Sequence, residues 1–351
     1  MTLRQGLLVL SLTLLGPLLA GCDLSGTTGG PDASGVAGVY VGNQGNFGDG
    51  NGSVTVYDPS TEQLRPQAIR GLGSIVQGIA VRDTTLLVMA NSAARIDVFS
   101  TDGPTQTGQV TGVTGPRYAA FPGPETAYVT DQSFMGPSAV RVLDLSGAAP
   151  RVVSTIPVSG SPEGIAVTDD RAYAALGAFG DTSLVAAIDV TRNTLAEEID
   201  VGCTPRDVAA DGGGDVFALC SDAAEAVVLE GATGTIRTRL SLPDTAETVF
   251  GVGDPASSAP EAEELYVATD TGVIRIDTRS DAVDALLDVG LSAAPGAVAY
   301  DAAREALYVA RAPGFTQRGT VTIHDRGGTQ TGSFPAGIAP TAIDFRPAEP
   351  Q

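Results

Sequence analysis

The feature that most constrains the fold of this chain is a unit that recurs loosely from residue 36 onward. Each copy has a short apolar strand, a polar turn, a second strand of the type LYVA, a variable loop and a third strand ending in Asp. The equivalent first-strand residues are Ile79, Tyr118, Ile165, Val208, Phe250, Val298 and Ile343. The gaps between them are 39, 47, 43, 42, 48 and 45 residues. This spacing is typical of a four-stranded propeller blade.

The repeat predicts an all-β fold, a seven-bladed β-propeller of four-stranded antiparallel blades. Short runs of β-branched and aromatic residues, separated by Gly, Asp, Asn and Pro, dominate after residue 35, and no helical pattern of useful length appears. A β-sandwich is the rival fold for many short strands. A sandwich has no reason to repeat at this period, so the propeller is favoured.

The two ends of the repeat region predict how the ring closes. The last first strand, TAIDF at 341–345, has no strands after it, and the region opens with VYVG at 39–42, which has no first strand before it. If the C-terminal strand pairs beside 39–42, it completes the first blade and removes an exposed edge. We therefore expect a ring closed by the C-terminal strand.

The first 22 residues resemble an export signal with a lipid attachment site. One Arg precedes an apolar run that is too short to span a bilayer comfortably, and the run ends on Leu19-Ala20-Gly21-Cys22. This ending is similar to the lipobox of bacterial lipoproteins, which implies that Cys22 is acylated and becomes the first residue of the mature chain. The alternative is an ordinary secretory signal with a chance Cys.

This resemblance sets the expected domain organisation and location. Residues 1–21 are expected to be a lipoprotein signal peptide, 22–35 a flexible tether rich in Gly, 36–346 the propeller and 347–351 a tail. The partner implied by Cys22 is a membrane, and the expected location is the extracytoplasmic side of a bacterial cell envelope.

The second strands of several units carry similar words: VYVGN, AYVTD, LYVAT and LYVAR. They resemble the YVTN family of seven-bladed β-propeller repeat proteins, over roughly residues 36–345. The corresponding words LLVMAN and VFALC depart from that pattern. The resemblance implies an extracytoplasmic binding or surface protein, and related propellers include lactonases and subunits of quinone enzymes.

Composition excludes several classes of function. The chain carries 41 acidic and 20 basic residues, a formal charge of −21, and such a surface repels nucleic acid. One His and three Cys leave few ligands for haem, zinc or iron–sulfur centres, so no cofactor and no metal site is expected.

Residues just before each first strand are predicted to surround one mouth of the central channel. The candidate ligand-binding residues there are Gln77, Arg117, Glu163, Arg206 and Glu247. Charges of both signs facing one another across a narrow mouth can hold a polar ligand. The alternative is that they pair only with each other and with water.

The loops between second and third strands carry a recurring Phe among small residues. These are Phe47, Phe134, Phe179 and Phe315. An exposed Phe ring gains nothing from water, so the four rings either fold back over the blades or form an apolar rim for a partner.

Catalytic patterns are scarce. There is no G-x-S-x-G motif, and the one His, His324, lies at the end of a third strand, where packing explains it. Glu163 with Asn91 or Asn43 is a conceivable but sparse metal set. The Asp residues after the third strands are interpreted as turn formers.

The two remaining cysteines are predicted to form a disulfide. Cys203 enters a first strand and Cys220 ends the second strand of the same hairpin, so both sulfur atoms reach the same end of one blade, on the channel-mouth face.

The sequence therefore predicts an envelope-anchored lipoprotein that acts as a non-catalytic binding, interaction or structural module, whose ligand is a protein or a small molecule. Two alternatives stay open. One is a metal-dependent, lactonase-like hydrolase at the channel mouth, and the other is an accessory subunit of an extracytoplasmic redox complex.

Overall fold

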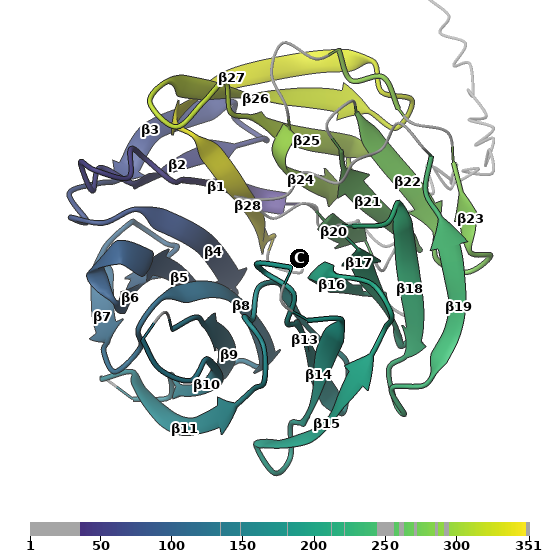
Figure 1. Ribbon diagram of the computed structural model, residues 1–351. Helices are drawn as coiled ribbons and strands as arrows, with labels where there is room; N and C mark the ends of the chain where they lie inside the picture. The colour runs from purple at the N-terminus through teal and green to yellow at the C-terminus, as the bar shows by residue number, and fades with distance from the viewer. Residues whose placement is uncertain are drawn as a thin grey trace, which may run out of the picture. The chain divides into compact units, whose positions relative to one another are not determined.

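The protein folds into a ring of seven four-stranded antiparallel sheets around a central channel (Figure 1). This architecture comes from a computed structural model. The structure describes residues 36–348 except 134, 148, 181, 212, 221, 244–255, 260–262, 270–271, 285–286 and 291–294. The predicted all-β, seven-bladed propeller is confirmed.

Each sheet is one blade. Its strands are given below in order from the innermost, beside the channel, to the outermost. Blade one contains β28 (Pro340–Pro347), β1 (Val36–Asn43), β2 (Ser53–Asp58) and β3 (Gln63–Ile69). Blade two contains β4 (Val76–Arg82), β5 (Thr85–Ala90), β6 (Arg95–Ser100) and β7 (Gln106–Val110), with a 3-10 turn η1 (Asn91–Ala93). Blade three contains β8 (Pro116–Gly123), β9 (Thr126–Asp131), β10 (Ala139–Asp144) and β11 (Arg151–Pro157).

The remaining blades follow the same order. Blade four contains β12 (Ile165–Val167), β13 (Arg171–Ala175), β14 (Leu184–Asp189) and β15 (Thr194–Asp200). Blade five contains β16 (Pro205–Ala210), β17 (Asp215–Cys220), β18 (Glu225–Glu230) and β19 (Ile236–Ser241). Blade six contains β20 (Ala256–Ala259), β21 (Glu264–Ala268), β22 (Val273–Asp277) and β23 (Ala282–Val283). Blade seven contains β24 (Pro295–Asp301), β25 (Ala306–Arg311), β26 (Arg318–Asp325) and β27 (Gln330–Ile338).

The C-terminal strand closes the ring as the sequence predicts. β28 pairs antiparallel with β1, with Val41 opposite Ile343 and Val39 opposite Phe345. Without β28, the inner edge of β1 would present unpaired backbone groups to the channel. The two ends of the described chain are therefore hydrogen-bonded neighbours in one blade.

The innermost strand of blade six differs from the expected one. The sequence places it around Phe250, but β20, which pairs with β21, begins at Ala256 and reads ASSA. Phe250 itself lies outside the described residues. Because β20 has no β-branched or aromatic side chain, the strand pattern misses it.

Seven apolar cores hold the ring together, one at each interface between neighbouring blades. The Tyr of the repeated second-strand word contributes to them. Tyr40, Tyr128 and Tyr173 are buried, and each hydroxyl donates to a backbone carbonyl of the next blade, with O···O distances of 3.1, 3.4 and 2.8 Å. A buried Tyr needs such a partner for its O–H. In these three second strands the Tyr thus links neighbouring blades.

The Asp residues that follow the third strands form turns, as the sequence predicts. In each, a carboxylate oxygen accepts a hydrogen bond from a backbone N–H two or three residues on; these are Asp58, Asp144, Asp189, Asp277 and Asp325. These five carboxylates therefore stabilise turns at the ends of the blades.

Among the residues described, no helix has the length and apolarity needed to cross a membrane.

Candidate functional site

A cavity of about 530 Å³ opens at the end of the channel where the loops between second and third strands meet. Its lining comes from blades one, two, three, four, five and seven: Gln44, Asn46, Phe47, Ile75, Gln77, Asn91, Gly115, Arg117, Gln132, Ala178, Phe179, Arg206 and Phe315. This volume lies within the range of small-molecule sites. Two sets of residues predicted separately, the channel-mouth set and the Phe set, thus contribute to one cavity.

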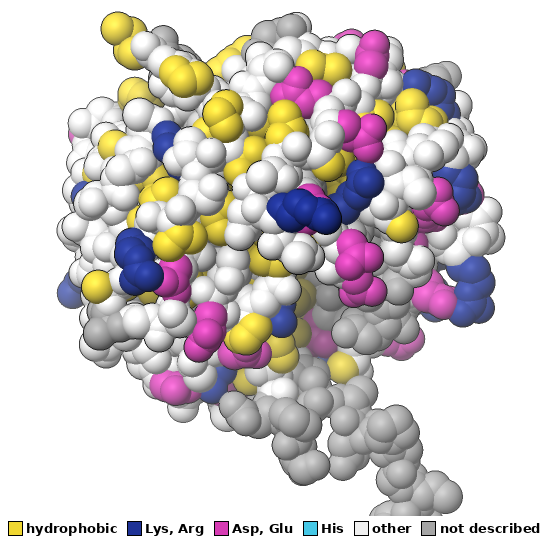
Figure 2. Space-filling model, turned by 90° about the horizontal axis from the view of Figure 1, so that it is seen from below, with side chains coloured by type: hydrophobic (Ala, Val, Ile, Leu, Met, Phe, Trp, Pro, Cys, Tyr) yellow, Lys and Arg dark blue, Asp and Glu magenta, His cyan; other side chains and the backbone are white. Residues whose placement is uncertain are grey.

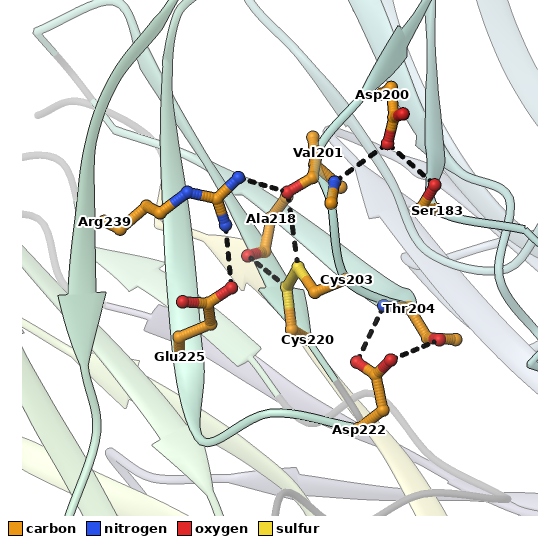
Figure 3. Close-up of a disulfide and its surroundings, with 11 residues drawn as sticks. Ser183, Asp200, Val201, Cys203, Thr204, Ala218, Cys220, Asp222, Glu225 and Arg239 are labelled. Atoms are coloured by element: carbon orange, nitrogen blue, oxygen red, sulfur yellow. Dashed lines mark hydrogen bonds and ion pairs between the residues drawn. A yellow bond between two sulfur atoms is a disulfide. The ribbon is translucent and has the colours of Figure 1, made fainter.

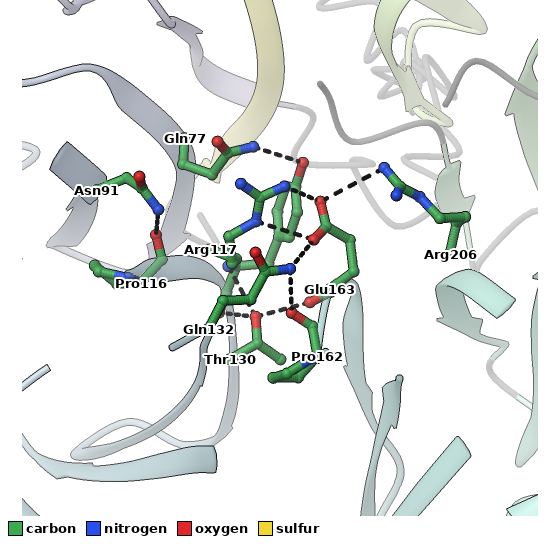
Figure 4. Close-up of polar contacts among 10 residues, drawn as sticks. Gln77, Asn91, Pro116, Arg117, Thr130, Gln132, Pro162, Glu163 and Arg206 are labelled. Carbon is green, nitrogen blue, oxygen red and sulfur yellow. Dashed lines mark hydrogen bonds and ion pairs between the residues drawn. The ribbon is translucent and has the colours of Figure 1, made fainter. Parts of the chain in front are cut away.

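Three of the predicted mouth residues lie inside the innermost strands and not just before them. Gln77, Arg117 and Arg206 are each the second residue of an innermost strand, namely β4, β8 and β16, whereas Glu163 precedes β12. Because these strands start around the channel, their first side chains converge on its mouth (Figure 4).

Glu163 is the centre of a buried polar cluster behind the cavity. Arg117 binds it through two N–H groups, with Nε 2.9 Å from Oε2 and Nη2 bonded to Oε1. Gln132 Nε2 donates to Oε2 at 2.6 Å, and Thr130 Oγ1 donates to the backbone carbonyl of Glu163 at 2.7 Å. The Glu163 side chain is only 5% exposed. Both carboxylate oxygens are therefore occupied by neighbouring blade three.

The charge on Arg117 is secured by this pair. Burial alone would lower the pKa of the Arg117 guanidinium, but the Coulomb attraction and hydrogen bonds of Glu163 outweigh it and raise the pKa above its usual value. Arg117 stays a cation whose charge Glu163 balances.

Arg206 approaches the same carboxylate from blade five but does not share it closely. Its Nη2 lies 4.0 Å from Glu163 Oε1, and its side chain is 14% exposed. Figure 4 shows the guanidinium pointing to the cluster from the opposite side to Arg117. The cluster of two Arg and one Glu thus leaves one positive charge at the cavity.

The disulfide lies directly before the strand that carries Arg206. Cys203 and Cys220 are joined, which confirms the predicted pairing, and both are buried (Figure 3). Next to the bridge, Thr204 N–H donates to Asp222 Oδ1 at 2.7 Å. These contacts fix the start of β16 against the end of β17, and so fix the backbone from which Arg206 extends.

Three of the four predicted Phe residues surround the cavity, and their rings are exposed. Phe47, Phe179 and Phe315 are 74%, 62% and 52% exposed. They do not fold back into the blades. We call these three residues the Phe rim. The loop that carries Phe179 approaches the start of β16, because Gly177 N–H donates to Pro205 C=O at 3.0 Å. A Cβ on Gly177 would block this approach.

Other predicted residues fall outside the described part of the chain. These are Cys22, Phe134 and Glu247. Their predicted roles in lipidation, the rim and the mouth stay predictions.

Sequence reasoning missed two amides of the cavity, Gln44 and Gln132, and singled out Asn91 only as a conceivable metal ligand. Gln44, Asn91 and Gln132 follow directly after second strands β1, β5 and β9, so they occupy equivalent places in three repeats. Their shared place directly after a second strand is the signal in the sequence that points to them. Gln44 is buried, and its Oε1 has no hydrogen-bond partner among the described residues.

The conceivable metal set does not converge. Asn91 Nδ2 donates to Pro116 C=O at 3.1 Å, and Asn43 is bonded within blade one and to Gly337 N–H at 2.7 Å, while Glu163 is held by Arg117. In the described part of the chain, the one group with metal-like spacing is Cys203, Cys220 and Glu225, whose cysteines form the disulfide.

His324 is a packing residue of blade seven, as predicted. It is 1% exposed, with Nδ1 2.9 Å from Gly328 O and Nε2 2.8 Å from Thr322 Oγ1. Burial lowers its pKa, so the ring is neutral near pH 7. It does not line the cavity.

Fold and cavity together define a seven-bladed β-propeller with a ligand-sized opening at one channel mouth. No family model matches the sequence, and no curated protein matches it. Solved structures do. The periplasmic gluconolactonase of Pseudomonas aeruginosa is 14% identical with a TM-score of 0.70, and the alignment covers 89% of this chain and 99% of that chain.

Two further structures are similar to the same degree. A functionally unknown protein from Desulfotomaculum acetoxidans is 13% identical with a TM-score of 0.69, covering 89% of this chain and 99% of that chain. Hydrazine synthase of Kuenenia stuttgartiensis is 18% identical with a TM-score of 0.63, covering 86% of this chain and 98% of that chain. At these identities the similarity establishes the fold alone.

Proposed function

We propose that this protein binds a small molecule in the channel-mouth cavity and does not transform it. The observation that carries the proposal is the composition of the lining. It combines two guanidinium groups, several amides and three aromatic rings, and its described residues include no carboxylate and no imidazole. Such groups orient and hold a ligand, but general acid–base chemistry needs a group that exchanges protons near neutral pH.

We further propose that the propeller is an envelope lipoprotein of the YVTN type. The lipobox-like ending at Cys22 and the LYVA words support this. The course of β1 fits it, because β1 runs from Val36 to Asn43 and so carries the chain about 25 Å along the channel toward the cavity. Val36, the first described residue, therefore lies at the end of β1 away from the cavity.

Ligand-observed NMR tests the binding function directly. We would add the folded domain, residues 34–351, to a mixture of small aromatic and aliphatic acids, amides and alcohols, and record saturation transfer. We expect transfer to at least one class, and loss of that transfer when the Phe rim is replaced by Ser. Absence of transfer to every member of the mixture would contradict the proposal.

A hydrolase is the second candidate, because the fold is similar to that of a gluconolactonase. It is tested by the rate of ring opening of glucono-δ-lactone, with and without a chelator. We expect the spontaneous rate in both cases. An acceleration that the chelator abolishes would establish the hydrolase instead.

A further inference from the structure

Arg206 is a cation with unused hydrogen-bonding capacity at the cavity wall. A guanidinium has five N–H donors, yet among the described residues the side chain of Arg206 donates no hydrogen bond, and its nearest acidic atom is Glu163 Oε1 at 4.0 Å. Its side chain is 86% buried, because 14% is exposed. The part of the guanidinium that reaches the cavity has no protein acceptor within hydrogen-bond distance, so a ligand with acceptor atoms can replace water there and form charge-assisted hydrogen bonds.

Glu163 supplies none of those acceptors at hydrogen-bond distance. Its Oε1 and Oε2 already accept from Arg117, and Oε2 also accepts from Gln132. Arg117 and Arg206 carry two positive charges and Glu163 one negative charge, so the net charge of the cluster is +1. No described carboxylate lines the cavity to cancel it. An anionic group is therefore the complement of Arg206.

Gln44, in blade one, is a second and independent residue with an unsatisfied hydrogen-bonding group. It is 7% exposed and lines the cavity, and its Oε1 accepts no hydrogen bond from the described residues. A buried amide oxygen without a donor costs free energy. A turn of the Gln44 side chain would bring Oε1 into the cavity, where a ligand can donate to it from a hydroxyl or N–H group. That donor lies at a point away from the anionic group, because Gln44 and Arg206 come from different blades.

The Phe rim indicates the kind of group that connects the ligand's anionic group to its hydrogen-bond donor. Phe47, Phe179 and Phe315 belong to blades one, four and seven and all line the cavity. Aromatic rings around an opening favour a flat apolar body, through burial of area and through offset or edge-to-face contact. An extended sugar acid or an inorganic anion offers no such surface.

We propose that the cavity binds an aromatic carboxylate that carries a hydrogen-bond donor on the far side of its ring. The carboxylate accepts two N–H groups of Arg206, the ring lies inside the Phe rim, and the donor bonds Gln44 Oε1. This deepens the proposed binding function and rests on it.

The charge of the whole chain makes the local positive charge selective. At −21 the protein repels anions in general. At an ionic strength of 0.15 M this repulsion is screened beyond about 8 Å, whereas a contact between Arg206 and a carboxylate inside the cavity is screened much less. Anions that lack the ring gain too little to remain bound.

Three matched naphthalene compounds test the proposal: 2-naphthoate, the neutral 2-naphthamide, and 6-hydroxy-2-naphthoate. The chain has no Trp, so the fluorescence of the naphthyl group reports binding without overlap from Trp. We expect 2-naphthoate to bind at least about tenfold more tightly than 2-naphthamide, as for a hydrogen bond to a charged group. We expect the hydroxyl to add about fivefold more.

Variants assign these effects to residues. Arg206→Gln should weaken 2-naphthoate about tenfold or more and leave 2-naphthamide within twofold. Arg239→Gln is the matched control, since Arg239 lies in the same blade, pairs with Glu225 and does not line the cavity. It should change neither. Gln44→Met should remove the gain from the hydroxyl and leave 2-naphthoate unchanged.

The outcomes separate this proposal from the binding function itself. Equal binding of 2-naphthoate and 2-naphthamide, or an Arg206→Gln variant that binds 2-naphthoate normally, overturns the anion assignment while the NMR mixture still reports a ligand site. Failure of every compound and of the whole mixture overturns both. If circular dichroism shows that Arg206→Gln does not fold, the comparison of carboxylate with amide on the unmodified protein decides.

Discussion

Glu163 is the residue on which the electrostatics of the channel mouth depend. Its carboxylate is 5% exposed and balances Arg117 while facing Arg206. Replacing it with Gln leaves two buried guanidinium groups without a counter-charge. We expect Glu163→Gln to lower the free energy of unfolding by about 3–5 kcal/mol, as is typical when one partner of a buried ion pair is removed. Urea denaturation measures this.

The matched control is Glu263→Gln. Glu263 pairs with Arg279, but these side chains are 47% and 75% exposed, so the change should cost less than about 1 kcal/mol. Similar small losses in both variants would show that the pair with Arg117 does not stabilise the mouth.

Asp344 gives the fold a pH dependence of unusual sign. It lies on β28, where its carboxylate accepts from Val81 N–H at 2.6 Å and Phe345 N–H at 2.7 Å, and burial raises its pKa to about 6. The folded state therefore holds this proton more tightly than the unfolded state does, so the contribution of Asp344 to stability falls as the pH rises from about 4 to about 6.

Asp344→Asn removes that loss. We expect the unfolding free energy of the variant, relative to the unmodified protein, to rise by about 2 kcal/mol between pH 4 and pH 6.5. Asp144→Asn should give the opposite sign, because hydrogen bonds from Ser146 lower the pKa of Asp144 and its stabilising effect is lost as the pH falls. A pH-independent difference for Asp344→Asn would contradict the prediction.

At this scale the sequence predicted charged residues better than neutral ones. Arg117, Glu163 and Arg206 are conspicuous because charge at the start of an apolar strand breaks the pattern. Gln44 and Gln132 are not conspicuous, since an amide after a strand also reads as an ordinary turn residue. Nor does the sequence reveal that Arg117 takes both oxygens of Glu163 and leaves Arg206 without them, because that depends on side-chain geometry across three blades.

Among the elements, β28 has the largest structural consequence. It provides the innermost strand of blade one and contacts β4 and β24 in the two neighbouring blades. Deleting residues 340–351 should lower the melting temperature by more than 10 °C or abolish cooperative unfolding, since an inner strand and parts of two apolar cores are lost. Calorimetry measures this, and removal of 349–351 alone is the control. An unchanged melting temperature in the larger truncation would count heavily against a closed ring.

The disulfide also constrains the strands of blade five. It joins the residue Cys203, just before β16, to the end of β17, close to Arg206 in the sequence. Cys203→Ser with Cys220→Ser should lower the free energy of unfolding by about 3 kcal/mol, the loop-entropy value for a separation of 17 residues. A thiol assay on the folded domain should find no free thiol before reduction and two after it. Two thiols before reduction would contradict the bridge.

Elements were predictable where their residues prefer strands and unpredictable where they do not. The LYVA words are recognisable because Tyr and Val suit a pleated surface buried on both faces. β20 reads ASSA and pairs with β21 through its backbone, so only the ring closure of the whole molecule requires a strand at that place. The sequence favoured the segment around Phe250 as the innermost strand, because Phe prefers strands.

For the whole molecule, exposed aromatic rings gather at one channel mouth, whereas charged side chains are spread over the outer surface. Acidic and Arg side chains are interspersed on the flank shown in Figure 2, with small apolar patches between them. Many of the carboxylates on the blades form turns or pair with Arg, as Asp144 and Asp281 do. The Phe rim stands apart, because its three exposed rings gather around one cavity.

The rim should therefore be dispensable for folding and necessary for binding. Replacing Phe47, Phe179 and Phe315 with Ser removes rings that are already half or more exposed, so we expect the free energy of unfolding to change by less than about 1 kcal/mol. Phe217→Ser is the contrast, because Phe217 is 1% exposed within a core and its loss should cost about 3–5 kcal/mol. Urea denaturation compares them, and fluorescence of 2-naphthoate reports binding. A triple variant that fails to fold would show that the rings plug the blades, whereas one that folds and still binds would place the ligand elsewhere.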